Sequence, residues 1–405
     1  MDMRFYFDVV CPYAYMASLQ IEALAARTGA TLIWRPILLG GVYRAIGRDQ
    51  DAQAGQSPAR ARVGDLDLQR QAERHGLTLN RPEGHPRRTV EAMRLITAAP
   101  EHRRPALAHA LFDAYWAQGR DVSDASLLRE IAAAHDLDPG CTQDPAVKQA
   151  LFDATDEAVA AGVFGVPAFV VGGDLFWGLD RLHLVEQALG GHTSWPDLPP
   201  NPLASPPSLT FFHDFSSPYS YLASTQIRRV AQRHGADLQL APFLLGALFH
   251  AIGTEGIPMH TFNAPKLRWY EKDMRDFARF YGVPYRFPST FPLHTVAALR
   301  VAIAKPDTTD HIYRAAWADD RNIGDPATLK AVLDDAGFDG ALLLEQAQQP
   351  EVKNQLRLNT DRARDLGACG APTFLVNGTS LFWGQDRLDQ VQAALAGWQP
   401  ATPLP

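Results

Sequence analysis

FDVVCPYAY, residues 7–15, returns 206 residues later as HDFSSPYSY, residues 213–221. Both stretches lead from an apolar run through a Cys-Pro or Ser-Pro pair into a tyrosine-rich segment. Further matches follow in the same order: residues 36–40 with 242–246, 165–169 with 370–374, and 176–182 with 382–388. Self-similarity of this length and order indicates that the chain is one domain written twice.

The composition limits the possible classes of function. A length of 405 residues predicts roughly two or three domains. A net charge of −7 supplies no basic field for a nucleic-acid backbone, so no nucleic-acid partner is expected. No long apolar run predicts a membrane span, and the first residues lack the pattern of a signal peptide. The three widely spaced cysteines, Cys11, Cys141 and Cys369, argue against a disulfide framework or a metal site and favour a reducing cytoplasm.

A proline-rich segment separates the two copies. Residues 195–207 hold six prolines, which exclude a helix or a central strand and predict a stiff, extended tether. The expected organisation is therefore a first repeat at residues 1–194, a linker at 195–208 and a second repeat at 209–405.

Within one copy, the pattern predicts strand, helix, strand, a long helical insert, two strands and a last helix. In the first copy these lie at residues 4–9, 13–27, 31–38, 50–162, 168–171, 174–177 and 180–189. This order predicts the α/β class, with helices on the faces of a sheet. A proline directly before a strand often follows a cis bond, so cis bonds are expected at Val166–Pro167 and Ala371–Pro372.

Several motifs carry a resemblance to a known family. They are DFSSPYSYLA at 214–223, NAPK at 263–266 followed by Asp273, AYW at 114–116, GRDVSD at 119–124, GVFGVP at 162–167, and FWGxDRL in both copies. In this order they resemble the 2-hydroxychromene-2-carboxylate isomerase family and the related kappa-class glutathione transferases. The resemblance implies two thioredoxin-like domains, each with a large helical insertion.

The resemblance also implies glutathione as the cofactor and a set of residues that hold it. The serine at the start of the first helix, which holds the thiol, maps to Ser217 and, in the first copy, to Cys11. The residues of the Gly-X-Pro turns, which pair with the glutathione peptide, map to Ala371 and Pro372 and to Val166 and Pro167. The residues before the closing Arg-Leu, which bind the γ-glutamyl end, map to Gln385 and Asp386 and to Asp180. Lys266 is a further candidate for binding the cofactor. Leu179 lacks the polar side chain of Gln385. Two family asparagines are absent, with Thr254 and Arg48 at one position and His294 and Arg88 at the other.

A helix N-terminus offers free N–H groups and partial positive charge, which stabilise a thiolate. Ser217 adds a hydroxyl donor there, although a serine at this place is also a preferred N-cap. Cys11 should have a lowered pKa for the same reason. It then holds glutathione by a hydrogen bond, forms a mixed disulfide or acts as a nucleophile, the alternative being a small buried hydrophobe.

The other candidates each have a simpler interpretation. Asp180 and Asp386 pair with the glutathione amine or cap the last helix. Lys266 and Arg60 meet a carboxylate or are solvated cations, the second reading being favoured for Arg60. Trp177 and Trp383 wall an aromatic pocket or, more commonly for large aromatics, belong to the core. His294 serves as a general acid or base or, more commonly for a lone histidine, is structural. Cys141 and Cys369 are expected to be inert, although Cys369 stays a weak candidate because it lies three residues before Pro372.

The leading hypothesis is a glutathione-dependent cis–trans isomerase or transferase in aromatic catabolism, acting on a small aromatic or conjugated carbonyl compound. The alternative is a thiol-disulfide oxidoreductase or a monothiol glutathione-linked redox protein that uses Cys11. The missing second cysteine in CPYA at 11–14 argues against dithiol chemistry. A non-enzymatic role for one copy is a third possibility. Because relatives are commonly dimers, the two repeats are expected to pack as an intramolecular pseudo-dimer.

Overall fold

The computed structural model describes residues 1–49, 55–193, 198–200 and 205–400, so most of the expected proline tether lies outside the described residues. Two compact units make up the chain. The first unit comprises Met1–Ala54, Leu68–Ser194 and Asn263–Tyr270, and the second comprises Gly55–Asp67, Trp195–Phe262 and Glu271–Pro405. Each unit therefore holds one repeat together with a short segment of the other.

Both repeats show the expected order of elements. The first contains β1 (Asp2–Phe7), α1 (Pro12–Thr28), β2 (Thr31–Pro36), α2 (Leu39–Ala45), α3 (Pro58–Arg74), α4 (Val90–Ala98), α5 (Arg104–Phe112), a short π-helix (Asp113–Ala117), α6 (Ala125–Ala134), α7 (Pro145–Ala160), β3 (Ala168–Val171), β4 (Asp174–Trp177) and α8 (Leu182–Ala188). The second contains β5 (Ser208–His213), α9 (Pro218–Arg233), β6 (Asp237–Pro242), α10 (Leu245–Ala251), α11 (Ala264–Tyr281), α12 (Val296–Ala304), α13 (Thr309–Trp317), α14 (Pro326–Asp335), α15 (Gly340–Gln346), α16 (Pro350–Asp365), β7 (Thr373–Val376), β8 (Ser380–Trp383) and α17 (Leu388–Leu395).

Each repeat is built on a four-stranded mixed sheet. The strand orders are β2-β1-β3-β4 and β6-β5-β7-β8, with one parallel pair and two antiparallel pairs in each sheet. The register is the same in both copies, because Phe7 lies opposite Pro36 and His213 lies opposite Pro242. Both sheets bury their central strands, as expected for a sheet covered on two faces. The predicted α/β class is confirmed.

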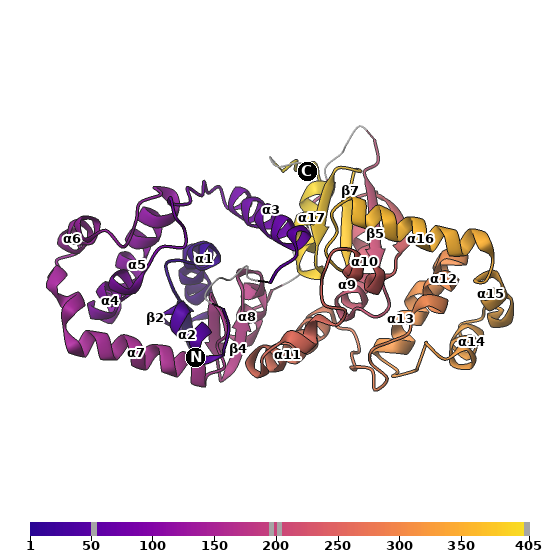
Figure 1. Ribbon diagram of the computed structural model, residues 1–405, viewed down its shortest axis with the longest axis horizontal. Helices are drawn as coiled ribbons and strands as arrows, with labels where there is room; N and C mark the ends of the chain where they lie inside the picture. The colour runs from indigo at the N-terminus through magenta and orange to yellow at the C-terminus, as the bar shows by residue number, and fades with distance from the viewer. Residues whose placement is uncertain (50–54, 194–197, 201–204, 401–405) are drawn as a thin grey trace. The chain divides into compact units, whose positions relative to one another are not determined.

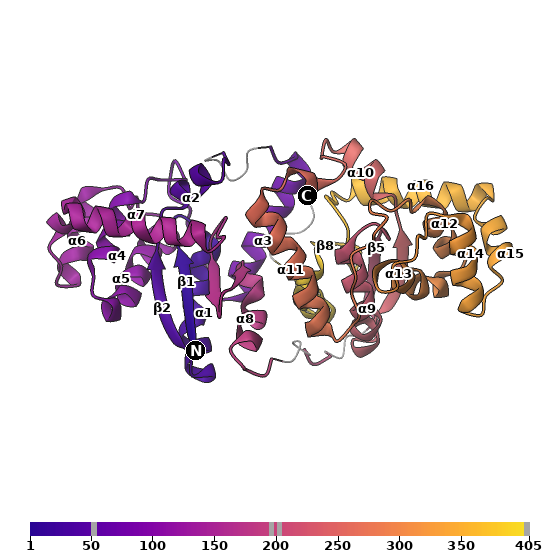
Figure 2. The ribbon, with the colours of Figure 1, turned by 90° about the horizontal axis from the view of Figure 1, so that it is seen from below.

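The inserted helices cover the edge strand that follows the first helix. In the first repeat α4 and α7 pack against β2, and in the second α12 and α16 pack against β6. Figure 1 shows α4, α5 and α6 gathered beyond β2, and α12, α13, α14 and α15 gathered in the second repeat. On the other side of the first sheet, α8 packs against α1 and β3 (Figure 2).

Local residues set the ends of the first helix in each repeat. Pro12 and Pro218 occupy the first helical position, where the missing N–H costs nothing. Gly29 ends α1 in the left-handed conformation, with a φ of 65°. The two expected cis bonds are present, before Pro167 and Pro372.

Candidate functional site

Each predicted reactive residue lies against the residue that precedes a cis-proline. The Ser217 hydroxyl donates a hydrogen bond to the Ala371 carbonyl at 2.9 Å and accepts one from the Ser220 N–H at 3.1 Å. The Cys11 Sγ lies 3.1 Å from the Val166 carbonyl oxygen, as a donor. The fold thus brings together residues about 155 positions apart in both repeats.

The two reactive residues differ in how they meet the helix. Ser217 caps α9 with its side chain, so the N-cap interpretation holds for this residue, whereas Cys11 makes no side-chain cap at α1. Burial raises the pKa of the Cys11 thiol to about 12, although the backbone N–H groups of Ala14 and Tyr13 act in the opposite direction. The expectation of a lowered pKa was wrong, because desolvation of the thiolate outweighs the helix N-terminus.

A buried carboxylate stands three residues before each reactive position, and sequence reasoning did not single it out. Asp214 accepts hydrogen bonds from the backbone N–H of Ser216 at 3.0 Å and of Leu245 at 2.9 Å. Burial raises its pKa, while these donors and the Thr295 side chain act against the rise. Asp8 makes the corresponding contacts in the first repeat. This carboxylate therefore links the reactive turn to the helix that follows the second strand. The sequence signal for its role was the aspartate itself, which recurs at the same place in both copies of the motif.

The closing motif forms a tight 3₁₀ turn in both repeats. The Asp386 and Asp180 carboxylates each lie beside the following arginine, Arg387 at 3.2 Å and Arg181 at 2.7 Å. The N-cap interpretation of these two aspartates is wrong, because the N-cap positions of α17 and α8 are held by the arginines. The aspartates sit one residue earlier, inside the 3₁₀ turns Gln385–Arg387 and Leu179–Arg181.

In the second unit, the side-chain amide of Gln385 has a hydrogen-bond donor that no described residue uses. Its side chain is fully buried, and its Oε1 accepts a hydrogen bond from the Tyr281 hydroxyl at 2.7 Å. Its Nε2 has no partner among the residues that the structure describes. A buried amide N–H without a partner is costly, so this atom suits a ligand acceptor such as a carboxylate. Leu179, the equivalent residue, gives the first unit no such donor.

The two candidate cations belong to different units from those expected. Lys266, predicted to serve the second repeat, lies in the segment Asn263–Tyr270 that groups with the first unit. Arg60, its counterpart 206 residues earlier, belongs to the second unit, where its guanidinium lies 5.1 Å from the Trp383 ring centroid. Arg60 is therefore partly buried by an aromatic ring and is not a freely solvated cation. Trp177 likewise packs against Trp269, in the first unit.

The remaining candidates differ in their exposure. His294 is exposed, Cys141 is half-buried, and burial raises the pKa of the Cys369 thiol to about 12. In the described parts of the chain, no cluster of three or more His, Cys, Asp or Glu side chains is arranged to hold a metal. Within the same parts, no helix is both long and apolar enough to span a bilayer.

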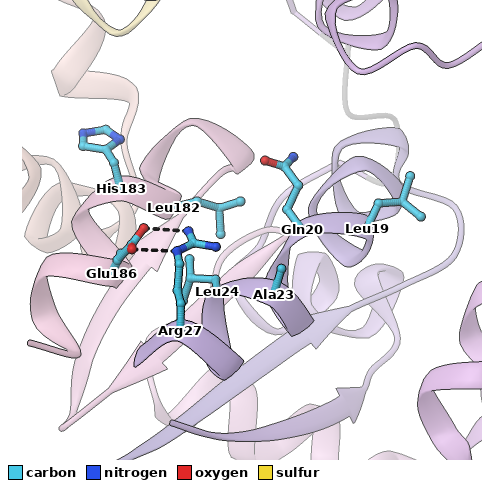
Figure 3. Close-up of a pocket in the computed structure, with 8 residues that line it drawn as sticks. All are labelled: Leu19, Gln20, Ala23, Leu24, Arg27, Leu182, His183 and Glu186. Carbon is cyan, nitrogen blue, oxygen red and sulfur yellow. Dashed lines mark hydrogen bonds and ion pairs between the residues drawn. The ribbon is translucent and has the colours of Figure 1, made fainter. Parts of the chain in front are cut away.

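A surface pocket of about 370 Å³ lies between α1 and α8 of the first repeat. Figure 3 shows Arg27 and Glu186 joined across it by two hydrogen bonds of 2.6 Å. Its lining comes from the later turns of α1 and from α8 and includes neither Cys11 nor Val166: Leu19, Gln20, Ala23, Leu24, Arg27, Leu182, His183 and Glu186. The pocket is thus separate from the candidate active site.

Comparison with known protein families identifies the family of this chain. The model of the DSBA-like thioredoxin domain matches twice, at residues 3–190 and 208–396. The chain belongs to the family of DsbA-like thioredoxin domains. It carries this domain in tandem.

The relatives of this DsbA-like protein each match about half of the chain. A 2-hydroxychromene-2-carboxylate isomerase from Sphingobium xenophagum is 29% identical over 192 residues, which are 46% of this chain and 97% of the relative. Human glutathione S-transferase kappa 1 is 26% identical over 220 residues, 49% of this chain and 95% of the relative. A solved structure of a 2-hydroxychromene-2-carboxylate isomerase shows 27% identity, covering 47% of this chain and 95% of its own, with a TM-score of 0.43.

Proposed function

We propose that this protein is a glutathione-dependent isomerase or transferase acting on small aromatic or conjugated carbonyl compounds, with Ser217 as its thiol-binding group. The carrying observation is the Ser217 hydroxyl, which sits at the N-terminus of α9 and 2.9 Å from the carbonyl before the cis-proline. The relatives named as 2-hydroxychromene-2-carboxylate isomerases and kappa glutathione transferases support this choice.

The residues of the second unit fit glutathione. The Gln385 Nε2 is a buried donor that suits the α-carboxylate of the γ-glutamyl end, and the Asp386 carboxylate suits its amine. The backbone of Ala371 suits the peptide of the cofactor, as strand edges before a cis-proline do in this fold. Arg60, over the Trp383 ring, adds positive charge to the same unit.

The chemistry follows from where these groups stand. Bound glutathione would supply a thiolate that adds to a conjugated double bond and is expelled after rotation about the resulting single bond. Ser217 turns its hydroxyl from the Ala371 carbonyl toward the sulfur and donates a hydrogen bond that stabilises negative charge. The N-terminus of α9 adds partial positive charge from the same side. The protein's task is to bind, orient and stabilise charge.

Glutathione-dependent interconversion of 2-hydroxychromene-2-carboxylate and trans-o-hydroxybenzylidenepyruvate tests the proposal. We expect turnover that requires glutathione and saturates with it, together with calorimetric binding of glutathione to the full chain. Absence of both turnover and binding would refute the proposed function.

Cys11 gives the first repeat a second candidate function, a monothiol glutathione-linked redox reaction. Its Sγ occupies the place of the Ser217 hydroxyl, against the carbonyl before the cis-proline. The thiol pKa of about 12 and the missing second cysteine weigh against dithiol exchange. An insulin-reduction assay separates the two functions, because exchange chemistry predicts activity that Cys11→Ser abolishes.

We also propose that the two repeats pack as an intramolecular pseudo-dimer in a reducing compartment. The support lies inside the second unit, where Asp67 of the first repeat pairs with Arg387 through hydrogen bonds of 2.5 and 2.9 Å. Small-angle X-ray scattering should then fit one compact particle. A profile of two separated bodies would contradict this packing.

A further inference from the structure

A pair of buried rings behind the reactive turn differs in chemistry between the repeats. In the first repeat the pair is Phe7 and Phe112, with ring centroids 5.7 Å apart. In the second repeat it is His213 and Tyr313, with centroids 5.6 Å apart. All four side chains are at most 1% exposed. The second repeat thus carries two polar rings where the first carries two apolar ones.

The two pairs occupy equivalent places in the fold. Phe7 and His213 end the equivalent strands β1 and β5, as the strand register shows. Four residues after Phe112 and Tyr313 comes a tryptophan, Trp116 or Trp317. Each indole donates a hydrogen bond to a carbonyl of its reactive turn, Val9 at 2.9 Å and Phe215 at 2.7 Å.

Hydrogen bonds connect the polar pair to the residue that carries the proposed chemistry. The Tyr313 hydroxyl donates to the Asp214 carbonyl at 3.2 Å and lies 3.0 Å from the His213 Nδ1. Burial lowers the pKa of His213 to about 3, so its ring is neutral. Because the Tyr313 hydroxyl gives its own proton to the Asp214 carbonyl, it accepts the hydrogen bond from the His213 Nδ1–H. The same Asp214 carbonyl accepts the Ser217 N–H at 3.1 Å. Tyr313 is therefore one peptide group away from Ser217.

The first repeat lacks this connection. The Asp8 carbonyl accepts the Cys11 N–H at 3.1 Å, but Phe112 has no hydroxyl to offer it. The residue three positions after the reactive one is also apolar in the first repeat and polar in the second: it is Ala14 in the first and the fully buried Ser220 in the second. The Ser220 hydroxyl lies beside Tyr313, although it makes no hydrogen bond of good geometry to any residue within the described ranges.

Stability does not account for the polar pair. Burying a histidine and a tyrosine costs more than burying two phenylalanines unless every polar atom is bonded. The His213 Nε2 has no partner among the residues described by the structure. The first repeat shows that the same scaffold folds around the apolar pair, which points to a role for the polar pair outside folding.

We propose that Tyr313, oriented by His213, is a positioning residue that holds the Asp214–Ser217 turn so that the Ser217 hydroxyl meets the sulfur of glutathione. This inference rests on the proposed function of Ser217. The inference also distinguishes the two repeats. In the second repeat, two side chains of α13, Tyr313 and Trp317, donate hydrogen bonds to the reactive turn. In the first repeat, Trp116 makes the equivalent hydrogen bond, but Phe112 cannot make the other.

The test replaces the polar pair by that of the first repeat, as Tyr313→Phe and as His213→Phe/Tyr313→Phe. All proteins carry Cys11→Ala, so that only the second repeat presents a candidate thiol site. The readouts are the pH titration of the bound glutathione thiolate by ultraviolet absorbance, kcat and KM, and the melting temperature. The matched control is Tyr221→Phe, which removes a hydroxyl bonded to the Pro284 carbonyl of the same unit.

We expect the Phe variants to titrate the bound thiol at a higher pH and to lose about tenfold in kcat. KM for glutathione should stay within about twofold, the melting temperature should be equal or higher, and Tyr221→Phe should titrate as the parent does. A parental titration and kcat in Tyr313→Phe overturn this inference and leave the proposed function standing. A melting temperature that falls in step with activity marks the pair as structural and also overturns it. A parent without any bound thiolate overturns both proposals.

Discussion

At the scale of single residues, the two reactive groups donate to equivalent carbonyls but differ in the hydrogen bonds that they accept. The Ser217 hydroxyl donates to a carbonyl and accepts from a backbone N–H at the same time. The Cys11 thiol makes only the donor contact, and burial raises its pKa to about 12. A buried hydroxyl is therefore ready to donate to a thiolate, whereas the buried thiol is held in its protonated form.

The state of Cys11 can be measured by alkylation. Because the thiolate is the reactive form, iodoacetamide should modify Cys11 slowly at pH 7, and the rate should rise about tenfold per pH unit toward the pKa. Mass spectrometry of labelled peptides follows this, with the half-buried Cys141 as the internal reference. Fast labelling of Cys11 that levels off near pH 7 would show a lowered pKa.

Gln385 and Leu179 occupy equivalent positions in the two repeats, so exchanging them tests whether the Gln385 side chain binds glutathione. Gln385→Leu removes the buried Nε2 donor and should weaken glutathione binding by about tenfold or more, the usual value of a hydrogen bond to a charged group. The reciprocal Leu179→Gln in the first repeat should not weaken binding. Isothermal calorimetry measures both, and unchanged affinity in Gln385→Leu would remove this residue from the site.

At the scale of elements, the closing turn depends on glycine. Gly384 has a φ of 105°, and a Cβ placed there would lie 2.5 Å from the Asp386 Oδ1. The carboxylate is thus held against bare backbone, where no side chain fits. The first repeat repeats this arrangement at Gly178, whose φ is 102°.

Gly384→Ala should destabilise the second unit by about 2 kcal/mol or more, because left-handed strain and a steric clash act together. Gly29→Ala is the matched control, since its φ is 65° and nothing lies within 4 Å of the added Cβ. That control should cost only about 1 kcal/mol. Chemical denaturation gives both values, and equal losses would contradict the clash.

Much of this scaffold could be predicted from the sequence because its determinants are local. Pro12 and Gly29 set the ends of α1, and the reactive turn lies inside one repeated motif. The His213–Tyr313 pair was not predictable, since its members are 100 residues apart. The offset between repeats also changes from 206 to 201 at the AYW and AAW segments that end in Trp116 and Trp317. The raised pKa of Cys11 depends on burial, which only the packed structure reveals.

At the scale of the whole molecule, each unit pairs a neutral histidine with a tyrosine hydroxyl, and the histidine is half-buried in the first unit and fully buried in the second. Burial lowers the pKa of His85 to about 4 and that of His213 to about 3, from an ordinary value of 6.5. Their partners are Tyr115 at 2.7 Å and Tyr313 at 3.0 Å. The Tyr313 hydroxyl also contacts its reactive turn, whereas the Tyr115 hydroxyl accepts a hydrogen bond from the Arg87 N–H.

These pKa shifts predict that both units lose stability in acid. A base with a depressed folded-state pKa contributes stability that is complete above about pH 6.5 and is lost as the pH falls toward 3 to 4. The melting temperature should therefore fall through this window. His213→Phe should flatten that dependence for the second unit, which calorimetry at several pH values would show. A slope unchanged by the substitution would mean that other groups cause the acid sensitivity.

We propose that duplication left two reactive turns of different chemistry, and that the turn at Ser217 binds the glutathione thiolate. The most direct test compares glutathione-dependent isomerisation by Ser217→Ala with that by Ser224→Ala. Ser224 is a buried serine of the same helix whose hydroxyl donates to the Tyr221 carbonyl. We predict that Ser217→Ala loses about 100-fold in kcat/KM while Ser224→Ala stays within about twofold of the parent. Equal activity of Ser217→Ala and the parent would contradict the account.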